Sequence, residues 1–424
     1  MEVSADAATR MEIRCARIPI DFFVMATLSF ACGVAMAPWV VGSLAVYFYQ
    51  APVLALVHTF AIGWITAAIM GVMYRYVPAL THATLPYPRL LMPQLVLYAI
   101  GASGIVAHFA LGSWSGIWSA ALVVMASAGL FAANIFPLLW PQVGRGVAET
   151  GMFIALCFLL IAATLGFLLA LDKSYGFMSG SVISNLAGHA HLAAVGWVTL
   201  TVCAVSYRMV PAIALPRITL PKSAGWQLYA LAAGVIGLAV TLLASLPGLT
   251  LWSAVIAIAL LAYIVTIVRL VWTHRRPIDW SVRHAIAGIA WLVIAIGLGI
   301  ALGFSGAQSE SGARLASIYG VAGILGWMGN FIIGISYYLF PGFVVRVRSL
   351  HHWGARSAVE LSMPQTRATV FVAYNGGLVA VIAGLVIANA TLCEIATVAI
   401  ALGGLIYSAT TMRTLSFAYR RAVR

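Results

Sequence analysis

Long apolar runs recur along the whole chain and are separated by short polar segments. A transmembrane helix needs about 20 consecutive, mainly apolar residues. Windows of that character lie near residues 20–46, 52–79, 90–111, 115–138, 147–170, 183–211, 225–246, 250–272, 284–304, 315–341, 368–389 and 391–412. The pattern predicts an all-α integral membrane protein with twelve transmembrane helices.

The composition excludes an ordinary soluble protein. Of the 424 residues, 63% are hydrophobic and only 8% are charged, and the mean hydropathy is +1.03. A globular domain with so little polar surface would not remain soluble. We expect a single membrane domain over residues 19–424, preceded by a polar tail at 1–18 and ending in a short basic tail.

The basic residues predict the orientation, because Lys and Arg are retained on the cytoplasmic side of short loops. If the chain starts inside and alternates, every Lys and Arg except Lys173 and Arg314 falls on that side. Both termini are therefore expected in the cytoplasm, in a bacterial-type inner membrane. The net charge of +13 follows from this asymmetry and does not indicate nucleic-acid binding. His284 and Arg348, near cytoplasmic helix ends, are expected among the lipid headgroups.

Three of the predicted helices share a sequence pattern at a nearly constant spacing. Their Gly-Trp pairs end at Trp64, Trp197 and Trp327, which lie 133 and 130 residues apart, and each is followed 14 residues later by a proline. The flanking helices fit the same period. We expect a ring with pseudo-threefold symmetry, made of four-helix repeats over about residues 19–140, 145–272 and 280–412.

Histidines lie within two of these three helices, where an unpaired imidazole is costly and therefore indicates function. His58 belongs to the first helix, and His189 and His191 belong to the second, all at a similar depth near the outer surface. On the repeat register His58 is equivalent to His191, and the third helix has Val321 at that place. His189 and His191 are two residues apart, so they should point to nearly opposite sides of their helix.

Neutral imidazole is a good axial ligand for haem iron, and two imidazoles from facing helices form an electron-transfer site. We expect His58 and His191 to be the leading ligand pair, with His189 binding a second haem or a metal, or hydrogen-bonding nearby. The chain has no CxxCH motif for covalent attachment, so one or two haem b groups are the expected cofactor. A purely structural alternative stays open, in which each imidazole only bonds a backbone carbonyl.

Three further residues near the outer ends of the helices are candidates. His108, on the third predicted helix, could supply another metal ligand. Arg314 could pair with haem propionates, although a solvated loop charge explains it equally well. Tyr319 occupies in the third repeat the place of His189, and its phenol could bind iron or a bound gas, or could be an interfacial anchor.

The sequence GHAHLAAVGWVTLTVCAVSYRMVP, ending at Pro211, resembles the histidine-pair helix of the catalytic subunit of haem–copper oxidases and nitric-oxide reductases, nearest the C-family oxidases. His58 and its following Gly-Trp look like the low-spin haem ligand on the second helix of that family. The resemblance implies a subunit I-like fold of twelve helices in three arcs that binds haem for O2 or NO chemistry. It also implies copper, other membrane subunits, and a periplasmic cytochrome c or quinol as redox partner.

Two departures from the family pattern concern the copper. The family has its histidine pair on the tenth helix, whereas here the pair lies on the sixth. The family's copper site also takes an adjacent histidine pair from the seventh helix, and residues 225–246 contain no histidine. The resemblance therefore extends to haem binding and leaves copper open.

Three functions remain compatible with the sequence. The preferred one is a membrane haem b protein that transfers electrons or binds a diatomic gas. The enzymatic one is an atypical terminal oxidase or nitric-oxide reductase, with a second metal held by His189 and His108. The third is a cofactor-free transporter or assembly subunit, against which the histidine register and the scarcity of intramembrane charge both stand.

Overall fold

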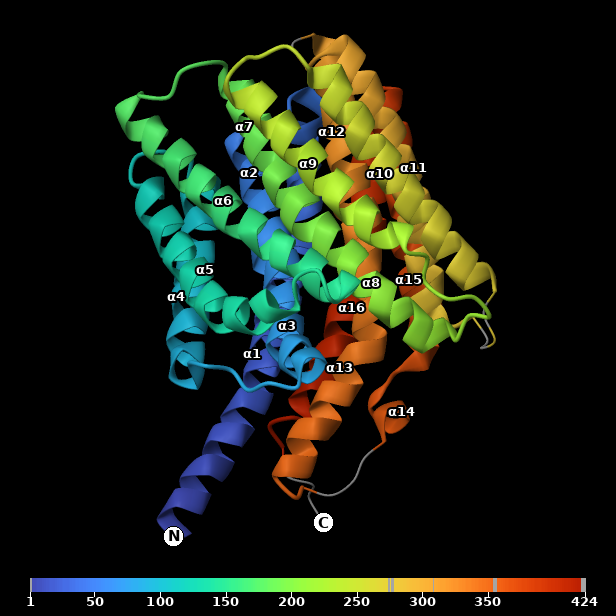
Figure 1. The fold of residues 1–424 in the computed structure, drawn as a ribbon. Coiled ribbons are helices and arrows are strands. Elements are labelled where there is room, and N and C mark those ends of the chain that lie inside the picture. Colours follow the sequence, from blue (N-terminus) through green and yellow to red (C-terminus); the bar gives the residue numbers. More distant parts are fainter. Residues whose placement is uncertain (1, 274, 276–277, 308, 354–356, 421–424) are drawn as a thin grey trace.

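The chain is almost entirely helical, and no strand occurs among the described residues. The computed structural model describes residues 2–273, 275, 278–307, 309–353 and 357–420 (Figure 1). Twelve helical stretches within them are long and apolar enough to cross a membrane. The predicted number of spans is thereby confirmed, and the chain is a multi-pass membrane protein.

Nine of the spans are built on one α-helix each, namely α1 (Glu2–Val46), α4 (Leu91–Ala110), α5 (Ile117–Leu139), α6 (Val147–Tyr175), α9 (Ser223–Leu243), α10 (Leu249–Trp272), α11 (Trp280–Ser305), α15 (Arg367–Val386) and α16 (Ala390–Ser416). The other three are composite and pair α2 (Ala51–His58) with α3 (Ala67–Thr81), α7 (Val182–His191) with α8 (Leu200–Ala214), and α12 (Glu310–Val321) with α13 (Asn330–Leu350). A short helix, α14 (Ala358–Leu361), lies between α13 and α15.

The start of α1 and the end of α16 lie at the same end of the bundle, as an even number of spans requires (Figure 1). Residues 2–18, expected as a polar tail, continue α1 as helix and extend beyond the other helices (Figure 1). Met1 and residues 421–424, which belong to the two expected tails, lie outside the described residues.

Each composite span has an eight-residue π-helical segment between its two α-helices, at Thr59–Thr66, Leu192–Thr199 and Ala322–Gly329. These segments begin 133 and 130 residues apart, which is the spacing of the Gly-Trp pairs they contain. π-Helical turns are rare and occur frequently at functional sites. In the first two spans the residue just before the π segment is a candidate ligand, His58 or His191.

The composite spans form the centre of the bundle. In their most apolar windows 61–78% of the residues are buried inside the protein, against 56% or less in the other spans. The three π segments contact one another in pairs. The grouping of the remaining helices into four-helix repeats stays a prediction of the sequence.

Indole hydrogen bonds join the central spans. Trp197 donates from Nε1 to Thr66 Oγ1 at 3.2 Å, and Trp327 donates to Thr199 Oγ1 at 3.1 Å. Both acceptors are the last residue of the preceding π segment. Between the first and third central spans, Trp64 packs instead against Gly329, the last residue of the third π segment. Because each tryptophan is at most 2% exposed, these bonds lie in the core of the bundle.

Two residues expected among the headgroups are buried, and for them the prediction was wrong. His284 is 0% exposed, and its Nδ1 bonds Asn330 Oδ1 at 2.8 Å. Arg348 is 2% exposed and donates from Nη1 to the carbonyls of Phe417 and Arg420, both at 3.0 Å. Arg348 is buried because α13 continues past its internal proline to Leu350, so that Arg348 lies against the end of α16.

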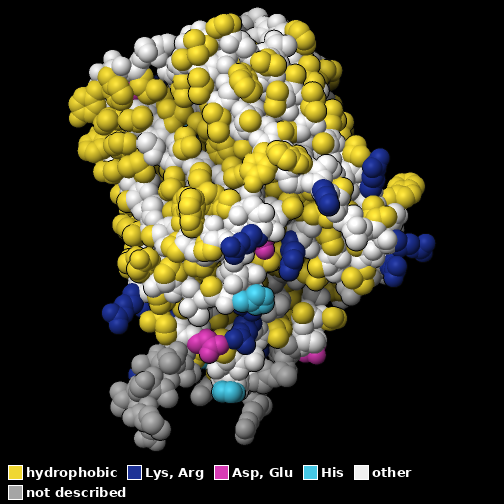
Figure 2. All heavy atoms as spheres, in the orientation of Figure 1, with side chains coloured by type: hydrophobic (Ala, Val, Ile, Leu, Met, Phe, Trp, Pro, Cys, Tyr) yellow, Lys and Arg dark blue, Asp and Glu magenta, His cyan; other side chains and the backbone are white. Residues whose placement is uncertain are grey.

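The surface has the asymmetry expected of a membrane protein. Figure 2 shows a face dominated by hydrophobic side chains, with Lys and Arg across its middle and lower part and none near its upper end. Large apolar residues such as Trp272, 83% exposed, and Ile258, 67% exposed, lie on the outside of the helices. Such exposed apolar surface is suited to contact with lipid.

Candidate functional site

His58 and His189 line the same cavity inside the bundle. The cavity measures about 270 Å³ and is bounded by the second to the sixth spans and by the tenth, so that all three π segments contribute to its wall. Around the two imidazoles its walls are mainly apolar side chains, among them Leu54, Val57, Ala61, Ile105, Phe109 and Ala162. Both histidines lie deep within the protein and are part-exposed because they face this cavity.

The His58 imidazole is oriented by its own helix. Its Nδ1 lies 2.7 Å from the carbonyl oxygen of Leu54, one turn earlier in α2. A carbonyl oxygen can only accept, so Nδ1 carries the hydrogen and Nε2 keeps a lone pair. The ring of Phe109, from α4, lies against the imidazole with its centroid 4.8 Å away. His58 is therefore held as the neutral tautomer whose Nε2 is free to coordinate a metal.

His189 comes from the last turn of α7 and lines the same cavity as His58. Its Nδ1 is buried without a hydrogen-bond partner of good geometry among the described residues. The ring rests against Gly166 of α6, where an added Cβ would lie 2.9 Å from the ring carbon Cε1. An unsatisfied buried imidazole nitrogen is uncommon, and it marks His189 as a candidate ligand.

His191 faces a different neighbour. Its Nδ1 lies 2.8 Å from the carbonyl oxygen of Ala187, so Nε2 is again the free acceptor. That Nε2 lies 3.3 Å from the hydroxyl of Tyr319 in α12, and the two rings are nearly parallel, with centroids 6.1 Å apart. His191 is not among the residues that line the His58 cavity. The structure therefore brings His58 together with His189, and His191 together with Tyr319.

A lysine lies at the outer end of the cavity, opposite the end that holds the chain termini. Lys173, near the end of α6, lines the cavity together with Tyr49, Trp114 and Asp172. Its ammonium donates to the Tyr49 hydroxyl and lies 5.2 Å from the centre of the Trp114 ring. The arrangement places a fixed positive charge where the apolar cavity meets the surface.

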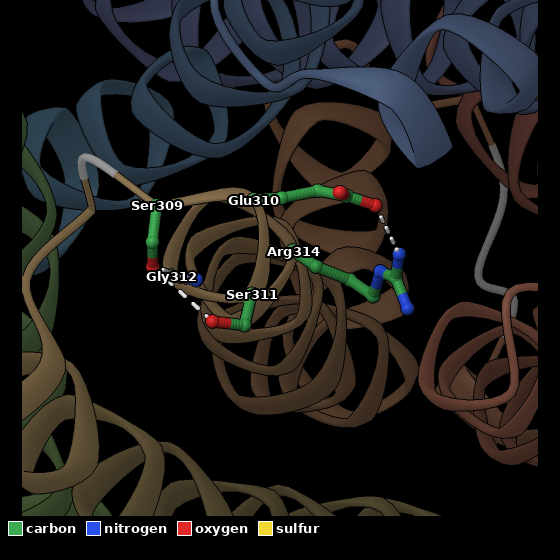
Figure 3. Close-up of polar contacts among 5 residues, drawn as sticks. All are labelled: Ser309, Glu310, Ser311, Gly312 and Arg314. Atoms are coloured by element: carbon green, nitrogen blue, oxygen red, sulfur yellow. Dashed lines mark hydrogen bonds and ion pairs between the residues drawn. The ribbon is translucent and has the colours of Figure 1, made fainter.

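Arg314, the other cation predicted on the outer side, lies in the first turns of α12 and does not line this cavity. Figure 3 shows it reaching back to Glu310, whose carboxylate lies 3.0 Å from Nη2 of the guanidinium. At the start of the same helix, Ser309 Oγ accepts from the backbone N–H of Gly312 at 3.0 Å. The charge of Arg314 is thus already paired within its own helix.

His108 lies near the end of α4, and its Nδ1 bonds the carbonyl of Ser113 at 3.0 Å. It is not one of the residues lining the cavity, although its neighbour Phe109 is. Within the described parts of the chain, no group of three or more His, Cys, Asp or Glu side chains is placed to hold a metal ion together.

Comparison with known proteins gives one kind of match. No family model matches the sequence, and no curated protein matches it. Among solved structures, a haem–copper terminal oxidase determined as a dimer by cryo-electron microscopy aligns with a TM-score of 0.65. The chain has the fold of a haem–copper oxidase. The alignment covers 97% of this chain and 85% of the oxidase chain, and 13% of the residues are identical. The predicted subunit I-like architecture is therefore confirmed at the level of fold.

Within this haem–copper oxidase fold, sequence reasoning missed two residues of the cavity. Gly166 supports the His189 ring, and Lys173 provides the outer cation. Lys173 stood out in the sequence as one of two basic residues on the outer side, which was a usable signal. Nothing local distinguishes Gly166 among the 39 glycines of the chain.

Proposed function

We propose that the protein is a membrane haem b protein of the haem–copper oxidase subunit I type, used for electron transfer or for the chemistry of O2 or NO. The observation that carries the proposal is the pair of imidazoles, His58 and His189, that face one apolar cavity from the second and sixth spans. Two axial histidines on separate helices are typical of haem in electron transfer. The fold supports the proposal, because the similar solved structure is a haem–copper terminal oxidase.

The residues present fit a haem in three respects. The Nδ1–H of His58 is held by a carbonyl, which leaves Nε2 as the ligand atom. Among the described residues the buried Nδ1 of His189 has no hydrogen-bond partner of good geometry, and Gly166 leaves room for the ring. The walls are mainly apolar, as ligand pockets are. The volume of about 270 Å³ is small for a macrocycle, so the cavity would have to widen when haem binds.

Each part of the chain around the cavity has a separate role in this proposal. The Leu54 carbonyl orients His58, and the packing of His189 against Gly166 sets the direction of the second ligand. Lys173 at the outer end would pair with a haem propionate, a charge-assisted contact. The apolar walls keep water away from the ligands. Bound haem would supply the one-electron redox change, which the protein's side chains do not provide.

His191 and Tyr319 support a second, enzymatic possibility. A phenol bonded to an imidazole outside the His58 cavity could hold a second haem or metal, as an atypical terminal oxidase or nitric-oxide reductase would require. In the absence of such a group the same contact has a structural role, since Tyr319 satisfies the free nitrogen of His191. We favour the single haem between His58 and His189, with copper as a further, less supported cofactor.

The topology proposed with this function follows the charge asymmetry of the loops. Both termini and the basic inner loops would face the cytoplasm of a bacterial-type inner membrane, and Lys173 would then lie near the periplasmic surface. A periplasmic cytochrome c, or a quinol from the bilayer, could deliver electrons to a haem at that depth. Other membrane subunits could bind the same bundle, organised as three repeats over about residues 19–140, 145–272 and 280–412.

Haem content of purified variants tests the proposal. The wild type, expressed with sufficient haem, should give a Soret band, sharp reduced α and β bands, and a pyridine haemochrome of haem b. His58→Ala and His189→Ala should each lose haem, or leave an open position that binds carbon monoxide and shifts the Soret band. His191→Ala is the matched control, because it changes the same helix outside the cavity.

The outcomes separate the alternatives. A wild-type protein without visible absorption would favour the cofactor-free transporter or assembly subunit. Loss of haem in His58→Ala and His191→Ala, with His189→Ala intact, would instead assign the ligand pair that the repeat register indicates. Two haems per chain, one of them lost in His191→Ala, would support the enzymatic form.

A further inference from the structure

A groove opens on the outside of the bundle between α9 and α10, at the end that holds the chain termini. Its volume is about 610 Å³. One wall is apolar and formed by Ile258, Leu261 and Val265 of α10, which are 67%, 45% and 49% exposed. The other end is polar, and its side chains include Thr219, Ser223, Gln227, Thr266 and Arg269. The groove thus runs from lipid-facing surface to a polar, cationic end.

Among the described residues the amide nitrogen of Gln227 lacks a partner at this polar end, whereas the amide nitrogen of its counterpart earlier in the chain has one. Tyr74 donates to Gln94 Oε1 at 3.3 Å, and 133 residues later Tyr207 donates to Gln227 Oε1 at 2.9 Å. The amide nitrogen of Gln94 donates in turn to Ser127 Oγ at 2.9 Å. Gln227 is 6% exposed, and its Nε2 has no hydrogen-bond partner among the described residues. A buried amide is normally paired, so we expect an acceptor from outside the chain.

Cations surround the same end of the groove. Arg269 lines it, and Lys222 lies between two lining residues at the start of α9. Arg217 is held nearby, since its backbone N–H donates to the carbonyl of Thr273 just after α10. All three side chains are exposed, and within the described chain none of them forms an ion pair with a carboxylate. Uncompensated cations at a helix end attract anionic lipid headgroups.

We propose that this groove binds one anionic phospholipid from the adjacent leaflet. The phosphate would lie against Arg269 and Lys222, and an acyl chain would follow the apolar wall of α10. Gln227 lines the groove with its amide nitrogen buried, so its side chain would turn to donate from Nε2 to a phosphate or ester oxygen. A zwitterionic lipid or a neutral quinone would leave the positive charges uncompensated. The proposal does not depend on haem, because the groove and the histidine cavity share no lining residue.

Native mass spectrometry of the full-length, delipidated protein titrated with phosphatidylglycerol tests this site. The wild type should retain one phosphatidylglycerol, and phosphatidylcholine should bind at least about tenfold more weakly. In the Lys222→Gln/Arg269→Gln double variant, affinity should fall about fivefold for each cation removed. Gln227→Leu should also weaken binding. The control is Arg89→Gln, because Arg89 is exposed and stands 133 residues before Lys222, and its affinity should equal that of the wild type.

Three results would overturn the proposal. The first is equal retention of phosphatidylglycerol and phosphatidylcholine, and the second is unchanged phosphatidylglycerol affinity in the double variant. The third is displacement of phosphatidylglycerol by a neutral quinone. Circular dichroism melts show whether the variants are folded. Gln227→Leu also removes the partner of the Tyr207 hydroxyl, so the double variant, which changes only exposed side chains, decides if Gln227→Leu proves unstable.

Discussion

Gly166→Ala should weaken haem binding, because Gly166 is the residue against which the His189 ring rests. The new Cβ would lie 2.9 Å from Cε1 of the imidazole and 3.5 Å from its Nδ1. Ordinary van der Waals contact begins at 3.4 Å, so the ring would have to retreat by about 0.5 Å. Ligand positions in functional sites tolerate displacements of only about 0.5 Å.

The expected size of the effect follows from the cost of overpacking, which is typically about 1–3 kcal/mol. If that cost falls on the haem-bound state, affinity should drop roughly fivefold to 150-fold. Titration of the haem-free protein with haemin, followed at the Soret band, measures the affinity directly. The loss of affinity should fall in the lower part of this range if the ring turns within the cavity, since Nδ1 of His189 has no hydrogen-bond partner of good geometry among the described residues to lose.

Gly129→Ala is the matched control for this prediction. Gly129 lies in the neighbouring span α5, and a Cβ there meets nothing within 4 Å. Both substitutions add one methyl group and remove a helical glycine, so they differ only in the contact with His189. Equal haem affinity in Gly166→Ala and Gly129→Ala would refute the placement of His189 as a ligand.

Three other substitutions test separate parts of the structure. Thr199→Val removes the hydrogen-bond acceptor of the buried Trp327 indole with little change of shape. The free energy of unfolding in dodecyl sulfate should fall by about 1 kcal/mol. An unchanged free energy would contradict that hydrogen bond. Arg348→Met leaves the carbonyls of Phe417 and Arg420 without their donor and should destabilise the folded protein by about 2–3 kcal/mol. Faster proteolysis of the C-terminal segment would show this loss, and wild-type resistance to the protease would argue against it. Lys173→Gln should weaken haem binding about tenfold through a lost charge-assisted contact. Arg314→Gln should leave haem binding unchanged, since the charge of Arg314 is already paired. Equal losses of affinity in a haemin titration would count against the assignment of Lys173.

The sequence alone determined the number of spans and the position of the three central helices. Span length and apolarity are local properties of the chain. Every span must match the thickness of the bilayer, however it packs against the others, so the sequence alone predicts them. The spacing of 133 and 130 residues between the Gly-Trp pairs also located the three π segments, which begin at the same intervals. The same register relates the two indole hydrogen bonds, from Trp197 to Thr66 and from Trp327 to Thr199.

Only the tertiary structure decided which histidines meet. If His58 and His191 are equivalent residues of a rotationally related pair of helices, they point into successive clefts and not at each other. His189, two residues earlier than His191, turns into the cavity of His58. The ligand pair itself stays a prediction, but the geometry favours His58 with His189 over the pair that the register indicated.

Burial and charge pairing at the helix ends were likewise decided by helices far apart in sequence. Arg348 is buried because α13 runs on to meet the end of α16, and His284 is buried because Asn330 lies across from it. Arg314 is paired within its own helix, while Lys173 faces the cavity. A sequence shows which residues are charged and near which end of a span they lie. Their partners depend on how each helix is rotated about its axis, and packing between distant spans sets that rotation.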